Sequence, residues 1–248
     1  MHHTLRRSYD KTVSAGEHLM NKRIAFPAIL CISICACLPA QAKAPATVVD
    51  YFSLISPDAL KQTDSKWKAI DIEGGYTIDV TVDIKNGYLS WNDEGTGGGT
   101  LTTDAALFVR TDKSIVLAVG KRSFDGVGMS SVITFWEFKN GAMAEITSGI
   151  MPAVTASDFL KEKADKQSVR LLGDNLSSLQ LEYILPRYGT SIEVRASTNR
   201  IDRDLSQLDD QSHAESIRKA ADTILCTKIF LDWNMKKGVF TIGKKSDK

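Results

Sequence analysis

The sequence predicts an α+β fold that is made mainly of antiparallel β meanders, with a few short helices. Residues 76–84 alternate apolar and polar side chains, and this period of two is typical of a strand with one buried face. Short runs with the same texture recur at regular spacing and are separated by turn residues. Strands do not alternate with long helical patterns, so parallel βαβ units are not expected.

The first half of the predicted fold, residues 43–155, begins with helices and continues as a meander. Residues 48–55 and 57–60 predict one or two short helices, with Pro57 in a first turn, where proline is tolerated. The pairs Asn86-Gly87 and Asn140-Gly141 predict tight hairpins in which both residues have positive φ. Strands are expected at 76–84, 88–91, 105–110, 114–120, 132–138 and 142–147.

The second half, residues 156–248, predicts a linking helix and a second meander that a helical insertion interrupts. Ser157 is a candidate cap for a helix over 158–163, and strands are expected at 179–185, 191–196 and 239–242. In the insertion, 199–222, Ser212 and Glu215 have the spacing of a capping box. The apolar residues that follow at helical spacing predict a helix packed on the sheet: Ile217, Ala220, Ala221 and Ile224.

The two halves resemble each other. In each, two strands lead to a strand that carries a tryptophan, and a glycine follows five residues later: Trp136 with Gly141, and Trp233 with Gly238. Two interpretations remain open, namely two related four-strand units and a chance likeness between ordinary hairpins. The halves are accordingly expected to form either two domains or one compact domain.

Residues 20–42 predict a secretory signal peptide. Basic Lys22 and Arg23 precede an apolar run at 24–39, and Ala40-Gln41-Ala42 fits a cleavage site. Residues 1–19 are then a dispensable leader, and either Met1 or Met20 is the start. The apolar run is short for a transmembrane span, and lipidation at Cys37 is the less favoured alternative to cleavage near Ala42. The expected location is periplasmic or secreted.

Removal of residues 1–42 changes the charge and cysteine content. Five of the 31 basic and two of the 30 acidic residues are lost, which leaves 26 minus 28, a net charge of −2. Because phosphate binding needs a clustered cationic surplus, nucleic acid is not an expected partner. Cys31, Cys35 and Cys37 are lost as well, so Cys226 remains alone, and its apolar surroundings in sequence predict a buried, inert thiol.

No catalytic residue, metal site or cofactor is predicted. His213 is the single histidine after residue 42, and a partly exposed structural role in the first turn of a helix is favoured for it. The glycine-rich loop 92–100 lacks the Gly-Lys-Ser/Thr ending of a phosphate-binding loop and the spacing of an EF-hand, so a hairpin connection is favoured over calcium binding. Paired acids at Asp202 and Asp204, and at Asp209 and Asp210, are interpreted as solvated helix ends.

Candidate binding residues are few. Acids that could serve a glycoside hydrolase are scattered, and their spacing selects no pair: Asp71, Glu73, Glu137 and Glu182. Trp67, Trp91, Trp136 and Trp233 are able to stack on sugars or anchor a partner. Core packing is favoured for Trp136 and Trp233. Exposed binding candidates are Trp91, Asp93 and Glu94, beside the glycine loop.

The sequence leaves two candidate functions open. The first is a non-catalytic envelope or secreted protein that binds another envelope or extracellular protein, as an inhibitor, immunity factor or adaptor. The second is a carboxylate-dependent hydrolase, or a binder, of glycans or envelope polymers. A pocket that holds two carboxylates would favour the hydrolase, and a flat apolar patch would favour the protein binder.

Overall fold

The computed structural model describes residues 44–247 apart from 72–73, 96–97 and 127, and all described residues belong to one compact unit. The predicted fold class is confirmed, because 13 strands form three sheets, every strand pairing is antiparallel, and four short α-helices accompany them. No helix in this part of the chain is long and apolar enough to cross a membrane. The predictions for the leader, the signal peptide, the cleavage site and Cys37 lie outside the described residues.

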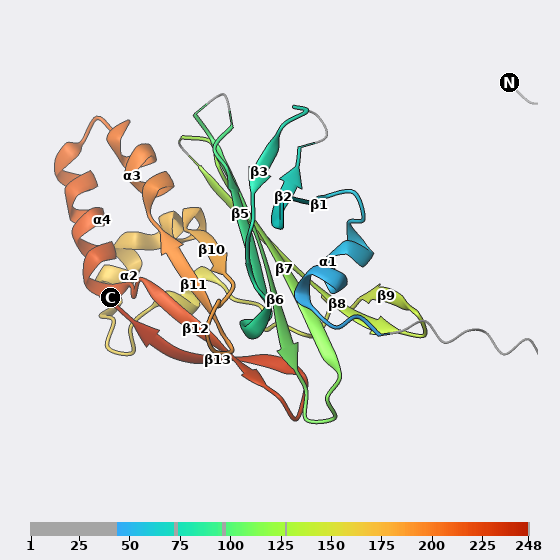
Figure 1. Ribbon diagram of the computed structural model, residues 1–248. Helices are drawn as coiled ribbons and strands as arrows, with labels where there is room; N and C mark the ends of the chain where they lie inside the picture. The colour runs from blue at the N-terminus through green and yellow to red at the C-terminus, as the bar shows by residue number, and fades with distance from the viewer. Residues whose placement is uncertain (1–43, 72–73, 96–97, 127, 248) are drawn as a thin grey trace, which may run out of the picture. The chain divides into compact units, whose positions relative to one another are not determined.

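The largest sheet is a six-stranded meander in which each strand pairs with the next along the chain (Figure 1). Its strands are β4 (Thr81–Asp83), β5 (Tyr88–Asp93), β6 (Thr100–Val109), β7 (Ile115–Phe124), β8 (Met129–Lys139) and β9 (Ala142–Glu145). Asn140 and Gly141 both have positive φ in the β8–β9 hairpin, as predicted. The prediction for Asn86-Gly87 is wrong in part, because Ile84–Asn86 form a short 3-10 helix and Gly87 alone, at φ 63°, is left-handed.

A small three-stranded sheet and one helix precede the meander. Helix α1 (Val48–Ile55) starts at a capping box between Thr47 and Asp50 and is followed by β1 (Leu60–Thr63), β2 (Lys66–Ile70) and β3 (Thr77–Asp79). The predicted helix at Pro57 is wrong. Asp64 and Ser65 both adopt positive φ and turn the chain back as a hairpin of β1 on β2. The predicted strand at 76–84 is divided between two sheets, as β3 and β4.

The second half forms a four-stranded antiparallel sheet with helices. After a 3-10 turn at Ala156–Phe159, the elements are α2 (Lys166–Leu172), a second 3-10 segment (Gly173–Ser178), β10 (Gln180–Ile184), β11 (Ser191–Ser197), α3 (Asn199–Ser206), α4 (Gln211–Ile224), β12 (Lys228–Asn234) and β13 (Val239–Ser246). Both predicted caps are wrong: Thr155 and Asp210 occupy the cap positions expected for Ser157 and Ser212. The predicted buried face of α4 is confirmed, since its four apolar residues are all buried.

Two apolar clusters lie on opposite faces of the six-stranded sheet. On one face, Leu89 and Leu117 pack with the buried side of α1. On the other face, Phe108 and Phe135 pack with the second sheet and its helices, where Trp233 is 7% exposed and its indole N–H donates to the Val109 carbonyl. Figure 1 shows α1 and β1–β3 on one side of the long strands, with β10–β13 and α2–α4 on the other. Core packing predicted for Trp233 is thus confirmed.

The likeness between the halves has a counterpart in strand order. β6–β9 and β10–β13 are each four consecutive antiparallel strands, and the tryptophan lies on the third strand of each set, β8 or β12. The glycine that lies five residues after each tryptophan, Gly141 or Gly238, has positive φ in its turn. Common descent of the halves stays a prediction.

Candidate functional site

A cavity of about 440 Å³ lies on the face of the six-stranded sheet that carries α1. Residues of β5–β8 line it from the sheet, and residues of α1, β2 and β3 complete its lining. The lining includes the side chains of Phe52 of α1, Asp71 after β2, Trp91 and Asp93 of β5, Thr103 of β6, Lys121 of β7, and Thr134 and Trp136 of β8. Its volume falls within the range of small-molecule sites in proteins.

The strand register places four of the lining residues in one row across the sheet. Trp91 pairs with Thr103, Thr103 pairs with Lys121, and Lys121 pairs with Val132. Residues that are paired in an antiparallel sheet project from the same face. An indole, a hydroxyl, an ammonium group and an apolar side chain therefore follow one another over four adjacent strands.

Two tryptophans and Phe52 form the aromatic part of the lining, and each tryptophan is held by a contact within the protein. Trp91 is half-buried and meets Phe52 edge to face, with ring centroids 5.6 Å apart and an interplanar angle of 88°. Trp136 is also half-buried, and its indole N–H donates to the Thr134 hydroxyl at 3.0 Å. Because these contacts restrict ring rotation, the cavity presents preorganised aromatic surface.

Thr103 contributes a hydroxyl group to the same lining. The residue is 2% exposed, and among the residues that the structure describes nothing hydrogen-bonds its hydroxyl. Because Arg122 Nε is the one side-chain nitrogen or oxygen of the described residues that is both fully buried and unpartnered, the Thr103 hydroxyl opens onto the cavity. It can therefore form a hydrogen bond with a bound molecule.

Acidic groups gather around Tyr76, beside the cavity. The Tyr76 hydroxyl lies 2.8 Å from both carboxylate oxygens of Asp93, and Asp93 also accepts from the Gly95 amide at 2.9 Å. The hydrogen bond with Asp93, followed by desolvation and a hydrogen bond with Asp71, raises the pKa of Tyr76 to about 12. Asp71 and Asp93 both line the cavity, so two carboxylates and the Lys121 ammonium share it.

The structure brings two of the three predicted binding residues to this cavity. Trp91 and Asp93 line it, whereas Glu94 is exposed next to Asp93 and is not part of the lining. Sequence reasoning missed Thr103 and Lys121, which lie just outside the strands predicted at 105–110 and 114–120 but inside β6 and β7. Their alignment with Trp91 depends on register across three strands, which the turn residues alone did not determine.

The other predicted candidates have separate surroundings. Glu137 forms an ion pair with Arg110, and Glu182 pairs with Arg122, while Glu73 lies outside the described residues. Trp67 is half-buried on β2 and packs against the α1 cluster, away from the cavity lining.

The remaining single residues occupy structural positions. His213 is exposed in the first turn of α4, where its amide donates to the Asp210 cap, and Asp202 and Asp204 pair with arginines on or near their helix. The burial predicted for Cys226 is confirmed at 3% exposure, and this burial raises the pKa of its thiol. Within the described ranges, no group of three His, Cys, Asp or Glu side chains is placed to hold a metal ion.

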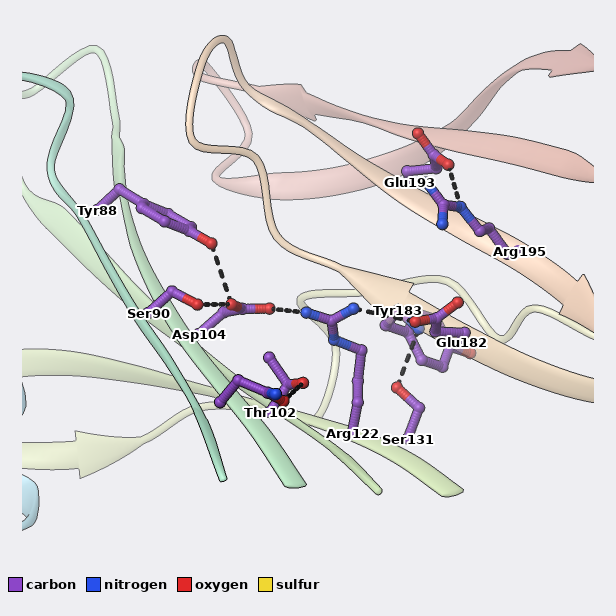
Figure 2. Close-up of polar contacts among 11 residues, drawn as sticks. Tyr88, Ser90, Thr102, Asp104, Arg122, Ser131, Glu182, Tyr183, Glu193 and Arg195 are labelled. Atoms are coloured by element: carbon purple, nitrogen blue, oxygen red, sulfur yellow. Dashed lines mark hydrogen bonds and ion pairs between the residues drawn. The ribbon is translucent and has the colours of Figure 1, made fainter. Parts of the chain in front are cut away.

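A buried ionic network lies on the opposite face of the same strands (Figure 2). Asp104, 1% exposed, accepts from the Tyr88 hydroxyl at 3.0 Å and the Ser90 hydroxyl at 2.6 Å. Arg122 binds Asp104 at 2.6 Å through one terminal nitrogen and Glu182 at 2.9 Å through the other. Since Glu182 lies on β10, the network joins the six-stranded sheet to the four-stranded one.

Arg122 is charged at every accessible pH in this setting. Burial, the largest influence, lowers the pKa of Arg122, but the charges and hydrogen bonds of Asp104 and Glu182 outweigh it and raise the pKa overall. The Arg122 Nε atom is buried without a hydrogen-bond partner in the described structure. One guanidinium thus holds two carboxylates, Asp104 of β6 and Glu182 of β10, and the network cross-links the two sheets.

Comparisons with known proteins identify the fold without a function. No protein-family model matches the chain, and no curated protein matches it. A solved structure described as a domain of an uncharacterized protein from Porphyromonas gingivalis W83 has a TM-score of 0.50 and 14% sequence identity, and covers 75% of this chain and 81% of that chain. At this identity the likeness concerns the arrangement of the sheets alone, so no activity or ligand is transferred from it.

Proposed function

We propose that this protein is a non-catalytic, exported binding protein, and that it binds a saccharide segment of an envelope or extracellular polymer in the cavity beneath α1. The observation that carries the proposal is the combination of Trp91 and Trp136 with the unpartnered Thr103 hydroxyl in one cavity. Sugar rings have apolar C–H faces that pack on indoles and hydroxyls that need hydrogen-bond partners. Export is supported by the signal pattern in residues 20–42.

The shape of the site favours a saccharide over the protein partner considered first. A stable protein interface buries about 800 Å² on each partner, and such an interface is usually broad and open. Here the aromatic side chains line a hollow of about 440 Å³, whose size suits a short chain of rings. A protein partner remains as an outcome of the experiment below.

A glycan array followed by calorimetry on the best ligand tests the proposal. In the purified protein, Trp91→Ala should weaken binding at least about tenfold, because a central aromatic anchor typically contributes 2 kcal/mol or more. Trp67→Ala is the matched control, since Trp67 is also half-buried but does not line the cavity. Thermal unfolding of both variants would separate lost binding from lost folding.

Two results would refute the saccharide proposal. The first is the absence of any saturable glycan ligand, and the second is equal loss of affinity in Trp91→Ala and Trp67→Ala at unchanged stability. A stoichiometric protein partner captured in place of a glycan would restore the adaptor interpretation.

A second candidate function, glycan hydrolysis, is favoured by one specific observation. Asp71 and Asp93 line the same cavity and both interact with the Tyr76 hydroxyl, and glycoside hydrolases use a pair of carboxylates at the scissile bond. Incubation with the glycan found on the array, with product analysis by mass spectrometry, tests it. Hydrolysis that Asp93→Asn abolishes would establish catalysis, and an intact glycan after prolonged incubation would exclude it.

A further inference from the structure

The charges of the cavity are divided between its strands. Asp93 is on β5, and Asp71 interacts with the same Tyr76 hydroxyl as Asp93. The two carboxylate acceptors of the cavity therefore lie together on its β5 side. Lys121 is on β7, and β6 separates these strands. Neighbouring strands lie about 4.8 Å apart, so β5 and β7 are separated by roughly 10 Å. A ligand that spans the cavity therefore meets acceptors at one end and an ammonium group at the other.

Lys121 has no counter-ion in the described structure. It is exposed and forms no ion pair or side-chain hydrogen bond with any described residue, and what distinguishes it from other unpaired lysines of the described chain is its place in the cavity lining. Its cross-strand neighbour is Thr103, whose hydroxyl opens onto the cavity and hydrogen-bonds no described residue. An ammonium group and a hydroxyl donor thus lie side by side in the cavity lining, and both are available to one acceptor.

We infer that the ligand carries a carboxylate, which binds Lys121 and Thr103, while hydroxyl groups at its other end donate to Asp71 and Asp93. The inference rests on the proposed saccharide-binding function and narrows it to acidic saccharides, such as those with uronic acid units. A singly charged group suits the site better than a doubly charged phosphate, because the cavity offers one ammonium group and also holds two carboxylates. The hydrogen bond from the Thr103 hydroxyl to the ligand carboxylate is charge-assisted.

A matched pair of probes tests this inference directly. Hexagalacturonate and its methyl ester have the same rings and differ in charge. Both are titrated into the purified protein, and the best glycan-array ligand is titrated in its acidic and its esterified form for comparison. The purified protein should bind the acid about tenfold more tightly than the ester, as expected for one charge-assisted hydrogen bond. This preference should shrink as ionic strength rises, because salt screens the charge.

Variants assign the preference to its residues. Lys121→Met should bring the ratio of acid to ester affinity close to one, Lys121→Arg should retain the preference, and Thr103→Val should reduce it. Lys139→Met is the control, because Lys139 is an exposed lysine on the neighbouring strand, outside the cavity lining. A merely structural Lys121 would change both affinities together and leave the ratio intact.

The outcomes separate this inference from the function on which it rests. Equal binding of acid and ester, or a ratio that Lys121→Met leaves unchanged, would overturn the inference while saccharide binding stands. Binding of sulfated glycans in preference to carboxylated ones would overturn the assignment of a carboxylate. If no saccharide binds in any form, the proposed function itself fails.

Discussion

Replacement of Arg122 by methionine should destabilise the protein strongly. The side chains of Asp104, Glu182 and Arg122 are 2%, 16% and 19% exposed, so the substitution leaves two carboxylates between the sheets without their cation. Removal of one partner from a buried ion pair costs about 3–5 kcal/mol. Domains of ordinary stability unfold with only about 5–15 kcal/mol, so Arg122→Met should lose a large fraction of the total.

Urea denaturation followed by circular dichroism measures this loss. Asp104→Asn combined with Arg122→Met removes the more deeply buried of the two unpaired charges, and the double variant should regain roughly half of the stability that the single variant loses. Arg195→Met is the control, because Arg195 pairs with Glu193 at the surface with its side chain 47% exposed. An exposed pair of this kind contributes about 0–1 kcal/mol.

A loss of less than about 1 kcal/mol, or a double variant as unstable as the single one, would show that the network does not bear the stability assigned to it.

Three further predictions concern other parts of the chain. Hydrogen bonds from the backbone and side chain of Ser168 keep the pKa of Asp165 below its ordinary value of 3.8, so the stabilisation by this α2 cap is present above that value and is lost as pH falls through the lower folded value. The urea midpoints of wild type and Asp165→Ala should therefore differ at neutral pH and converge in acid, and a constant gap would contradict this. Burial raises the pKa of Cys226, so its peptide should be modified slowly by a thiol reagent in native protein and rapidly in guanidinium, as mass spectrometry can follow. Gly238 has φ +67°, and its replacement by alanine should cost about 1–2 kcal/mol in urea unfolding, whereas Gly128→Ala, without positive φ, should cost less.

The strand content was predictable from sequence because alternation and turn residues act locally. The strands predicted at 105–110 and 114–120 correspond to β6 (Thr100–Val109) and β7 (Ile115–Phe124), which are both longer than predicted. The three-stranded sheet was not recognised, because its hairpin depends on positive φ at Asp64 and Ser65, residues that adopt it much less readily than glycine. The sequence also did not reveal that the chain passes from the three-stranded to the six-stranded sheet at Val80. Residues 77–83 keep one alternating pattern, although β3 pairs with β2 and β4 pairs with β5.

Only the cavity residues on β5 were predictable from the sequence. Trp91 and Asp93 attracted notice as an aromatic and an acidic residue beside a glycine-rich loop. Thr103 and Lys121 are ordinary strand residues in sequence, and their importance follows from pairing with Trp91 across three strands. Non-local register of this kind is a property of the folded sheet, and no local pattern encodes it fully.

Strand alternation has a further consequence for how this chain can change over evolutionary time. Thr103 and Lys121 face the cavity, whereas the next residues, Asp104 and Arg122, face the second sheet. A single-residue insertion or deletion within β6 or β7 would exchange these roles, burying the wrong group on one face and removing the charge pair from the other. Length variation in this hairpin should therefore be confined to its turn at Thr111 and Lys113, where added residues leave the phase of both strands unchanged.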